Sequence, residues 1–389
     1  MKPKHKADVI VVGGGPAGSF LASALSARGK EVIILEKEEF PRDKPCGGGL
    51  TQKAVSLLDD ELDEIIENRC YELCSSYAGR RPFSYTLDRP IIYMVQRASF
   101  DHFLLECARK QGAMVHEGER VKSINISSEG VEVKTKSARY QGSYVAGTDG
   151  AAGIVSRSLA MVHKKSAGLA VTKKIVPQKR DDAAEWQGKF AMDFGIVPRG
   201  YGWVFPKADH LNVGVFTQLP SLSGLRETLA EYIRMRLPQT ANDVEADTSH
   251  ADLALIPFGG KKNKLHGPRA ILAGDSASLV DPLLGEGIYY ALRSASIAAE
   301  VLIKALDTGS AEVLSEYSAR VHDELVSELR ASLFISRIFY GMPGLSYRTL
   351  FNQRVMEGYR KTVSSYSKKG ETPYRRLLKE ALSSFLFLR

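Results

Sequence analysis

The chain has few of the residues and patterns that mark secreted, metal-binding or membrane-spanning proteins. Its 389 residues include only four cysteines, and the apolar run near the N-terminus is broken by glycines within five residues. We therefore expect no secretory signal, no disulfide framework and a reducing, cytoplasmic setting. No run of eighteen apolar residues occurs, so the sequence predicts no segment that crosses a membrane.

Several catalytic and binding motifs are also missing. The eight histidines show no HxxxH or HxH spacing. Cys70 and Cys74 would lie one turn apart on a predicted helix, but no third or fourth ligand is near them in sequence, so we expect no metal site. The sequence has no GxSxG motif for a serine nucleophile and no groove-reading motif, so we expect no nucleic-acid partner. The acidic stretch 59–68 predicts the solvated side of a helix.

The net charge of +8 is concentrated at the C-terminal end. Residues 331–389 hold 11 Lys or Arg and 3 Asp or Glu, so the preceding residues are balanced in charge. In residues 375–389 the apolar side chains recur at helical spacing. A basic, amphipathic segment of this kind suits an anionic membrane surface. The alternative is a helix that packs on its own domain beneath a solvated basic face.

Residues 8–36 carry the pattern of a nucleotide-binding βαβ unit, in which an apolar strand leads into a GxGxxG turn, a helix and a second buried strand. Gly13 would permit the tight turn, Gly15 the close approach of backbone to a pyrophosphate, and Gly18 the packing of helix on strand. Glu36 would accept hydrogen bonds from ribose hydroxyls. The unit predicts a dinucleotide without distinguishing NAD from FAD. It would place at the cofactor Gly13, Gly15, Pro16, Ala17, Gly18, Glu36 and Lys37.

Residues 269–302 predict a further strand, a loop with two glycines, and a long helix that begins near Gly285 and Gly287, with Ile288 also expected at the cofactor. Gly285 and Gly287 would let backbone N–H groups approach a flat, electron-rich ring, and the helix N-terminus would stabilise negative charge on it. Asp275, at the end of the strand, could accept a hydrogen bond from a ribityl hydroxyl. These features favour FAD.

The order of these segments resembles the aromatic-hydroxylase-like flavoproteins. That group has a GxGxxG unit, then a central DG segment, matched here by "GTDGAAGIVSR" at 147–157, and then a "GD…P…GxG" segment, matched at 274–288. The segment 96–113 is also similar to the arginine and following helix of that group. The resemblance implies that Arg97 contacts the phosphate region of FAD and that the backbone of Val121 contacts the adenine.

Two further segments resemble the geranylgeranyl reductase family, which reduces carbon–carbon double bonds of polyprenyl chains with FAD. They are "KPCGGGL" at 44–50 and "PRGYGWVFPK" at 198–207. The next strand of that family usually carries Gly-x-Gly, whereas this chain has Asn212 in place of the first glycine. The resemblance implies a prenyl-lipid substrate, and an external reductant that is either NAD(P)H or a ferredoxin-like electron-donor protein.

Tyr201, Trp203 and Phe205 would share one face of a strand because side chains alternate along it. We expect these rings to wall an apolar channel that binds the prenyl chain, and the small residues between them to let another layer, such as the flavin domain, approach. The alternative is an ordinary core face of a sheet.

Reduction of an isolated alkene needs a proton as well as a hydride, so we expect a dry, apolar pocket with an acid beside the flavin. The resemblance puts Cys46 and Gly47 next to the flavin ring. Cys46 is the first candidate for a functional residue, as the proton donor or only as part of the pocket wall, and Tyr201 is the second candidate acid.

The predicted fold class is α/β (α+β overall), with a Rossmann-type FAD-binding domain, an inserted β-sheet substrate domain and a helical C-terminal part. The expected boundaries are 1–60, 90–160 and 265–305 for the FAD domain, 61–89 and 161–264 for the substrate domain, and 306–389 for the basic helical region. The main functional hypothesis is a polyprenyl reductase, cytoplasmic and peripheral at the membrane. The alternatives are a flavin-dependent monooxygenase or epoxidase and a flavin-bound lipid carrier.

Overall fold

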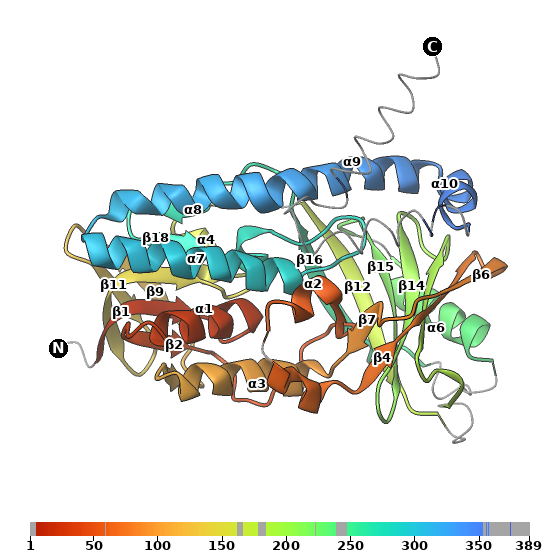
Figure 1. Cartoon of the computed structure of the whole chain (residues 1–389), viewed down its shortest axis with the longest axis horizontal. Helices are drawn as coiled ribbons and strands as arrows, with labels where there is room; N and C mark the ends of the chain where they lie inside the picture. Colours follow the sequence, from red (N-terminus) through yellow and green to blue (C-terminus); the bar gives the residue numbers. More distant parts are fainter. Residues whose placement is uncertain are drawn as a thin grey trace, which may run out of the picture.

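The computed structural model describes residues 5–58, 60–161, 166–177, 184–221, 223–238, 247–352, 355, 357 and 374. A Rossmann-type sheet and a second, antiparallel sheet lie at opposite ends of the molecule, and helices α8 to α10 run along one side of both (Figure 1). The larger helices are α1 (Pro16–Ser26), α3 (Arg97–Lys110), α6 (Leu225–Arg236), α7 (Ile288–Thr308), α8 (Leu314–Val321), α9 (Ser327–Gly341) and α10 (Pro343–Leu350), and the short ones are α2 (Gln52–Val55) and α4 (Ile154–Ser158).

The first sheet has the strand order β17-β18-β11-β1-β2-β8, with the hairpin β9-β10 attached to β11. Strands β1, β2, β8, β11 and β18 run parallel, as the βαβ pattern predicts. Their bounds are β1 (His5–Val12), β2 (Val32–Leu35), β8 (Met114–His116), β9 (Ser123–Ile126), β10 (Val131–Lys134), β11 (Arg139–Gly147), β17 (His266–Gly267) and β18 (Ala270–Leu272).

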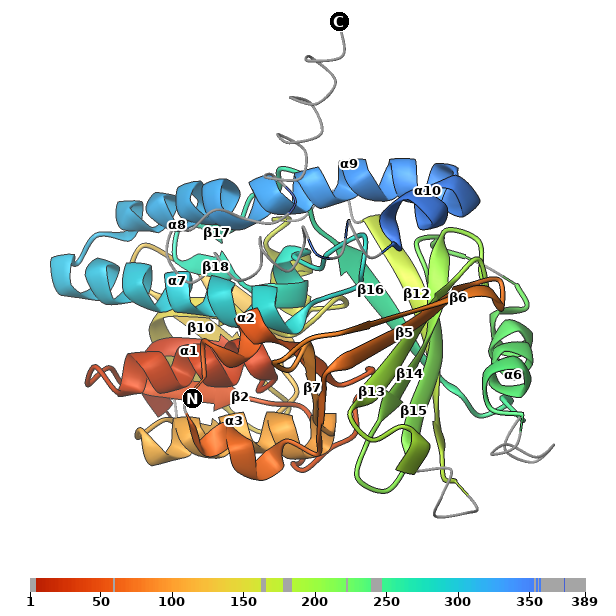
Figure 2. The ribbon, with the colours of Figure 1, turned by 45° about the vertical axis from the view of Figure 1, so that its right-hand side comes forward.

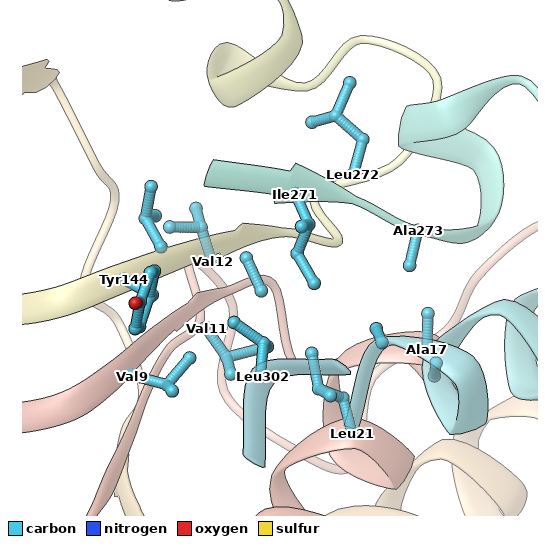
Figure 3. Close-up of a cluster of buried hydrophobic side chains, with 14 of the residues drawn as sticks. Val9, Val11, Val12, Ala17, Leu21, Tyr144, Ile271, Leu272, Ala273 and Leu302 are labelled. Carbon is cyan, nitrogen blue, oxygen red and sulfur yellow. The ribbon is translucent and has the colours of Figure 1, made fainter. Parts of the chain in front are cut away.

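The core of this domain forms between the parallel strands and helices α1 and α7. Val9 and Val11 of β1 are completely buried, as are Leu21 of α1 and Leu302 of α7 (Figure 3). Ile10, between the two valines on β1, is also completely buried, so this strand is apolar on both faces, as expected of a parallel sheet that is covered on both. This arrangement confirms the α/β fold class and the Rossmann-type domain.

The second sheet has the strand order β16-β12-β15-β14-β13-β5-β6 and is antiparallel except where β13 pairs with β5. It stands at the opposite end of the molecule from the Rossmann-type sheet (Figure 2). Its strands are β5 (Glu72–Tyr77), β6 (Arg80–Thr86), β12 (Ser166–Ile175), β13 (Lys189–Phe194), β14 (Gly200–Pro206), β15 (Leu211–Thr217) and β16 (Asp252–Phe258). The domain boundaries given above stay a prediction.

Helix α6 covers the outer face of this sheet. A side chain at Gly202 would come within 2.7 Å of the ring of Tyr232, so the glycine is needed for the ring to lie against β14. The Tyr232 hydroxyl donates a hydrogen bond to Asp193 on the neighbouring strand (2.8 Å). The layer that approaches the small residues of β14 is therefore α6, and our suggestion of the flavin domain was wrong.

A small third sheet, β3-β7-β4, lies between the two larger ones (Figure 1). Its strands are β3 (Gly49–Thr51), β4 (Asn68–Cys70) and β7 (Ile92–Met94). The helix predicted for Cys70 and Cys74 was wrong, because Cys70 ends β4 and Cys74 lies in β5, where pairing with neighbouring strands outweighs local helical spacing. The acidic stretch forms a 3-10 helix only over Asp60–Ile65.

The C-terminal elements α8 and α9 are continuous through a π-helical turn, His322–Val326. Within the described ranges no helix is long and apolar enough to cross a membrane, and no group of three or more potential ligands could hold a metal ion. The amphipathic segment that we predict over 375–389 lies outside the described residues.

Candidate active site

The GxGxxG turn between β1 and α1 leaves no room for a side chain at its first and last glycines. Gly13 has a φ of +103°, and a side chain there would come within 2.6 Å of the Thr148 carbonyl. A side chain on Gly18 would come within 1.9 Å of the Gly13 carbonyl. Gly15 caps α1, whose first residues are Pro16 and Ala17, so the helix begins with free N–H groups behind an open backbone surface. This cradle suits a pyrophosphate.

The carboxylate of Glu36 is 4% exposed and lies directly behind the turn. It accepts hydrogen bonds from the backbone N–H groups of Gly14 (2.6 Å) and Glu38 (3.0 Å). It is thus oriented at the end of β2, where the βαβ pattern places the ribose. Lys37 is exposed and forms an ion pair with Glu38 (3.6 Å), while Val121 lies between β8 and β9 with its side chain in the core.

Arg97 begins α3 and forms a bidentate ion pair with Asp101, through its Nε (2.8 Å) and one Nη (2.7 Å). Arg42 contacts the same carboxylate (3.0 Å). Burial alone would raise the pKa of Asp101, but the two arginines outweigh burial and lower it. The guanidinium of Arg42 is also 3.7 Å from where a side chain on Gly15 would begin. Sequence reasoning missed Arg42, which lies beside the phosphate cradle.

The second glycine segment forms a loop that ends in α7. Asp275 does not end a strand as predicted, because β18 stops at Leu272 and Asp275 lies in a 3-10 turn, Gly274–Ala277. Its carboxylate is nevertheless 3.5 Å from where a side chain on Gly287 would begin. Gly287 caps α7, Ile288 is its first residue, and Gly285 has a φ of +71°.

The residues just before Gly285 are held by polar side chains from distant parts of the chain. Tyr201 of β14 donates to the Leu284 carbonyl (2.5 Å), and Tyr340 of α9 donates to the Leu283 carbonyl (2.8 Å). The buried carboxylate of Asp281 accepts hydrogen bonds from Ser332 and from Tyr374 (2.6 Å). We call residues 281–285 the flavin loop. Of these anchors, sequence reasoning named only Tyr201.

The loop that carries Cys46 is anchored by Lys207, the residue after the "YGWVFP" strand. Lys207 is only 7% exposed. Its ammonium group donates hydrogen bonds to the carbonyls of Gly48 (3.0 Å) and Val95 (2.9 Å). Burial lowers the pKa of Lys207 to about 8, against the smaller opposing effect of Cys46. The Cys46 thiol is free, half-buried and accepts a hydrogen bond from Gly48 N–H (3.4 Å).

Tyr201, Trp203 and Phe205 lie on the inner face of β14 and connect the two loops. The Tyr201 hydroxyl is 3.6 Å from where a side chain on Gly285 would begin, and the Phe205 ring is 2.9 Å from the same position on Gly47. Tyr201, Trp203 and further rings, including Phe194, Phe216 and Tyr347, form one buried aromatic cluster. The rings thus contact both loops that we expect at the flavin.

Two cavities lie at opposite ends of β14, a strand that spans about 20 Å. The first, of about 230 Å³, lies near Gly200 and is lined mainly by apolar and aromatic residues such as Tyr77, Phe194 and Tyr340. The second, of about 50 Å³, lies beside Cys46 and is lined by polar residues that include Arg97, Thr172 and Asn212. The surroundings of Cys46 are therefore more polar than the dry pocket that we expect from the sequence.

Asn212, which replaces the glycine usual in the family, forms a hydrogen bond with the aromatic strand. Its side-chain oxygen accepts hydrogen bonds from the indole N–H of Trp203 (2.9 Å) and the hydroxyl of Thr172 (3.0 Å). The Thr172 hydroxyl has a second acceptor, the Val213 carbonyl. The indole N–H of Trp203, in contrast, depends on the side-chain oxygen of Asn212. The amide therefore fixes the orientation of the Trp203 ring.

We expect Asn212→Ala to destabilise the protein by about 1–3 kcal/mol, because it leaves the buried Trp203 N–H without an acceptor. Thermal unfolding measures this loss. In a Trp186→Phe background, the emission of Trp203, the only tryptophan left, should also change. The control is Asn125→Ala, on an exposed position of β9, which should leave both readouts unchanged. Equal stability of the two variants would contradict the assigned role.

The glycine cradle, the oriented Glu36 and the cap of α7 fit FAD, and the comparisons with known proteins agree. Residues 6–327 match the family described as FAD binding domain. An uncharacterised protein of Methanosarcina barkeri is 32% identical over 350 residues, which is 89% of this chain and 87% of that protein. A menaquinone reductase of Mycolicibacterium smegmatis is 30% identical over 320 residues, 76% of each chain.

Two further matches concern proteins named for prenyl reduction. A chloroplastic geranylgeranyl diphosphate reductase of Arabidopsis thaliana is 28% identical over 357 residues, covering 86% of this chain and 75% of that protein. A crystal structure of a geranylgeranyl bacteriochlorophyll reductase-like protein from Thermoplasma acidophilum has a TM-score of 0.73 at 21% identity, over 86% of this chain and 88% of that one. The latter likeness supports the fold.

Fold, site and family match together define the chain as an FAD-dependent oxidoreductase. Its similarity to the named reductases is spread over most of its length. The chain belongs to the geranylgeranyl reductase family.

Proposed function

We propose that this protein reduces carbon–carbon double bonds in the polyprenyl chain of a lipid, a pigment precursor or a quinone. The observation that carries the proposal is the contact of one aromatic strand with both loops expected at the flavin, through Tyr201 at Gly285 and Phe205 at Gly47. The reduced form of FAD, generated by an external reductant, would supply the hydride for such a reduction. Because polyprenyl lipids reside in bilayers, the proposal includes contact with a membrane surface.

The aromatic cluster is suited to binding an apolar chain and to tolerating positive charge on it. Ring faces attract cations, and the effect grows where water is excluded. Tyr201 and Trp203 are 7% and 5% exposed, so the cluster excludes water from this part of the site. The apolar cavity near Gly200 extends this environment to the far end of β14, where it provides room for the end of a prenyl chain.

The decisive experiment reduces the FAD-loaded protein with dithionite under argon, so that its natural electron donor need not be known. Addition of a prenyl lipid should then reoxidise the flavin and yield a product heavier by two hydrogens. A flavin-dependent monooxygenase would instead form product only in air and would add oxygen. A lipid carrier would bind the lipid and form no product, and either of these results would refute the proposal.

Within this proposal Cys46 delivers the proton. Tyr201 is the weaker candidate because its single O–H already bonds the Leu284 carbonyl, and because burial raises the pKa of its hydroxyl. Cys46 lies instead at the wall of a cavity. Polar side chains line the same cavity, and under the proposal one of them returns a proton to the thiol.

We expect Cys46→Ala to slow oxidation of the reduced flavin by the prenyl lipid by about 10²-fold or more, the contribution typical of a positioned acid. Stopped-flow single-turnover measurements isolate this step from product release. Cys107→Ala, at a half-buried cysteine of α3, is the matched control and should react normally. Unchanged rates for Cys46→Ala would remove this residue from the mechanism.

A further inference from the structure

Exposed apolar side chains gather on the outer side of α9 and α10. Phe334 is 52% exposed and Ile338, one turn later, is 49% exposed. The pattern continues through the junction of the two helices into α10, where Met342 is 55% exposed and Leu345 is 58% exposed. Large apolar groups of this size clustered within a dozen residues mark an interaction site more often than an ordinary surface.

The same surface is basic. Arg330, Arg337 and Arg348 are exposed, and the sequence has no Asp or Glu between residues 329 and 350. On α9, helical spacing puts Arg330, Phe334 and Arg337 on the same side. We call the exposed apolar side chains of α9 and α10, together with these three arginines, the apolar-basic face.

The opposite side of the two helices is fixed to the protein. Phe339 and Tyr340 of α9 and Tyr347 of α10 are buried in the aromatic cluster that also contains Tyr201. The apolar-basic face is therefore held rigidly at the edge of the molecule, along which α8, α9 and α10 run (Figures 1 and 2). The 230 Å³ cavity reaches the junction of α9 and α10, since Tyr340 and Pro343 belong to its wall.

We propose that the apolar-basic face docks on an anionic lipid surface and so brings the junction of α9 and α10, part of the wall of the apolar cavity, to the bilayer. Apolar side chains enter the interface between headgroups and acyl chains, while arginines pair with anionic headgroups. A second copy of the chain is a poorer occupant, because a two-fold dimer through this face would bring like-charged arginines together. The entry of a prenyl chain by this route rests on the proposed function, whereas the docking itself does not.

The test measures binding of the FAD-loaded, full-length protein to vesicles by flotation. The vesicles contain phosphatidylcholine, with or without phosphatidylglycerol, at low and high salt. We expect binding that requires phosphatidylglycerol and weakens with salt. The double variant Phe334→Ser/Ile338→Ser should bind the vesicles at least about tenfold more weakly than the unaltered protein. Arg337→Gln/Arg348→Gln should lose the dependence on phosphatidylglycerol.

Leu253→Ser/Leu255→Ser is the matched control, because these leucines of β16 are 56% and 46% exposed at another part of the surface. It should bind vesicles as the unaltered protein does. The proposal is overturned if the unaltered protein ignores vesicles, if the face variants bind normally, or if light scattering shows a dimer that those variants dissociate. A parallel assay with a short prenyl alcohol in detergent tests the reductase activity separately, and the face variants should keep their rate there.

Discussion

Purified Gly18→Ala protein should contain no FAD, because the added methyl group would come within 1.9 Å of the Gly13 carbonyl and 2.6 Å of the Thr148 hydroxyl. Both are closer than real side-chain contacts allow, so the helix must move away from β1. Such a shift would displace the N–H groups that face the pyrophosphate and close the cradle. The absorbance of the flavin near its visible maximum, relative to protein absorbance, measures the loss directly.

A matched control is Gly341→Ala at the end of α9, where a methyl group would meet nothing within 4 Å. That variant should retain a full complement of FAD. Circular dichroism shows whether the Gly18→Ala protein is still folded. If it is folded, it should also fail to bind FAD that is added to it. Normal flavin content in Gly18→Ala would show that the turn between β1 and α1 does not hold the cofactor as we infer.

Lys207→Met should lower the rate of prenyl reduction about a hundredfold, the cost expected when a reacting group is misplaced by about 1 Å. The ammonium of Lys207 ties the Gly48 and Val95 carbonyls together, and methionine cannot replace either hydrogen bond. The loop that carries Cys46 would therefore lose its anchor. The measurement is again single-turnover oxidation of the reduced holoenzyme by a prenyl lipid.

The same variant should change how stability depends on pH. Burial lowers the pKa of Lys207 from 10.5 in the unfolded chain to about 8 in the folded one. Between these values the unfolded chain holds the proton and the folded chain does not, so this residue makes the folded state more stable as pH rises. The unfolding free energy of the unaltered protein should therefore rise relative to Lys207→Met by about 3 kcal/mol from pH 7 to pH 10.5.

Urea unfolding at several pH values checks this difference, in which contributions of other groups cancel. Lys122→Met, at an exposed lysine, serves as the control and should show a constant difference. If the difference in unfolding free energy between Lys207→Met and the unaltered protein were also independent of pH, the ammonium of Lys207 would not be buried away from water.

The sequence was most informative where function depends on a short continuous segment. The turn from Gly13 to Gly18, the parallel strands beside it and the glycines before α7 are encoded within a few residues, so pattern and spacing predicted them. Cys70 and Cys74 show the reverse case. Their spacing fits a helix equally well, and only pairing with strands far along the chain makes them parts of a sheet.

The missed residues act across long distances in sequence. Arg42 meets Asp101, and Lys207 meets Gly48, only after the domains have packed. Asp281 gains its partners Ser332 and Tyr374 from the C-terminal part in the same way. A lysine after a strand or an aspartate before a proline carries no local signal for such contacts. Asn212 did stand out in the sequence, as a departure from the family, but its bond to Trp203 could not be read from that departure.

The flavin loop is hydrogen-bonded to two separate parts of the protein, so substitutions in either part affect its position. Tyr201 joins the loop to the substrate sheet, and Tyr340 joins it to the helix whose outer side is apolar and basic. A displacement of that helix therefore pulls on residues 283–285, the backbone that we expect beside the isoalloxazine. Under the two proposals made above, a substitution that shifts the membrane-facing helix therefore also shifts the backbone at the redox centre.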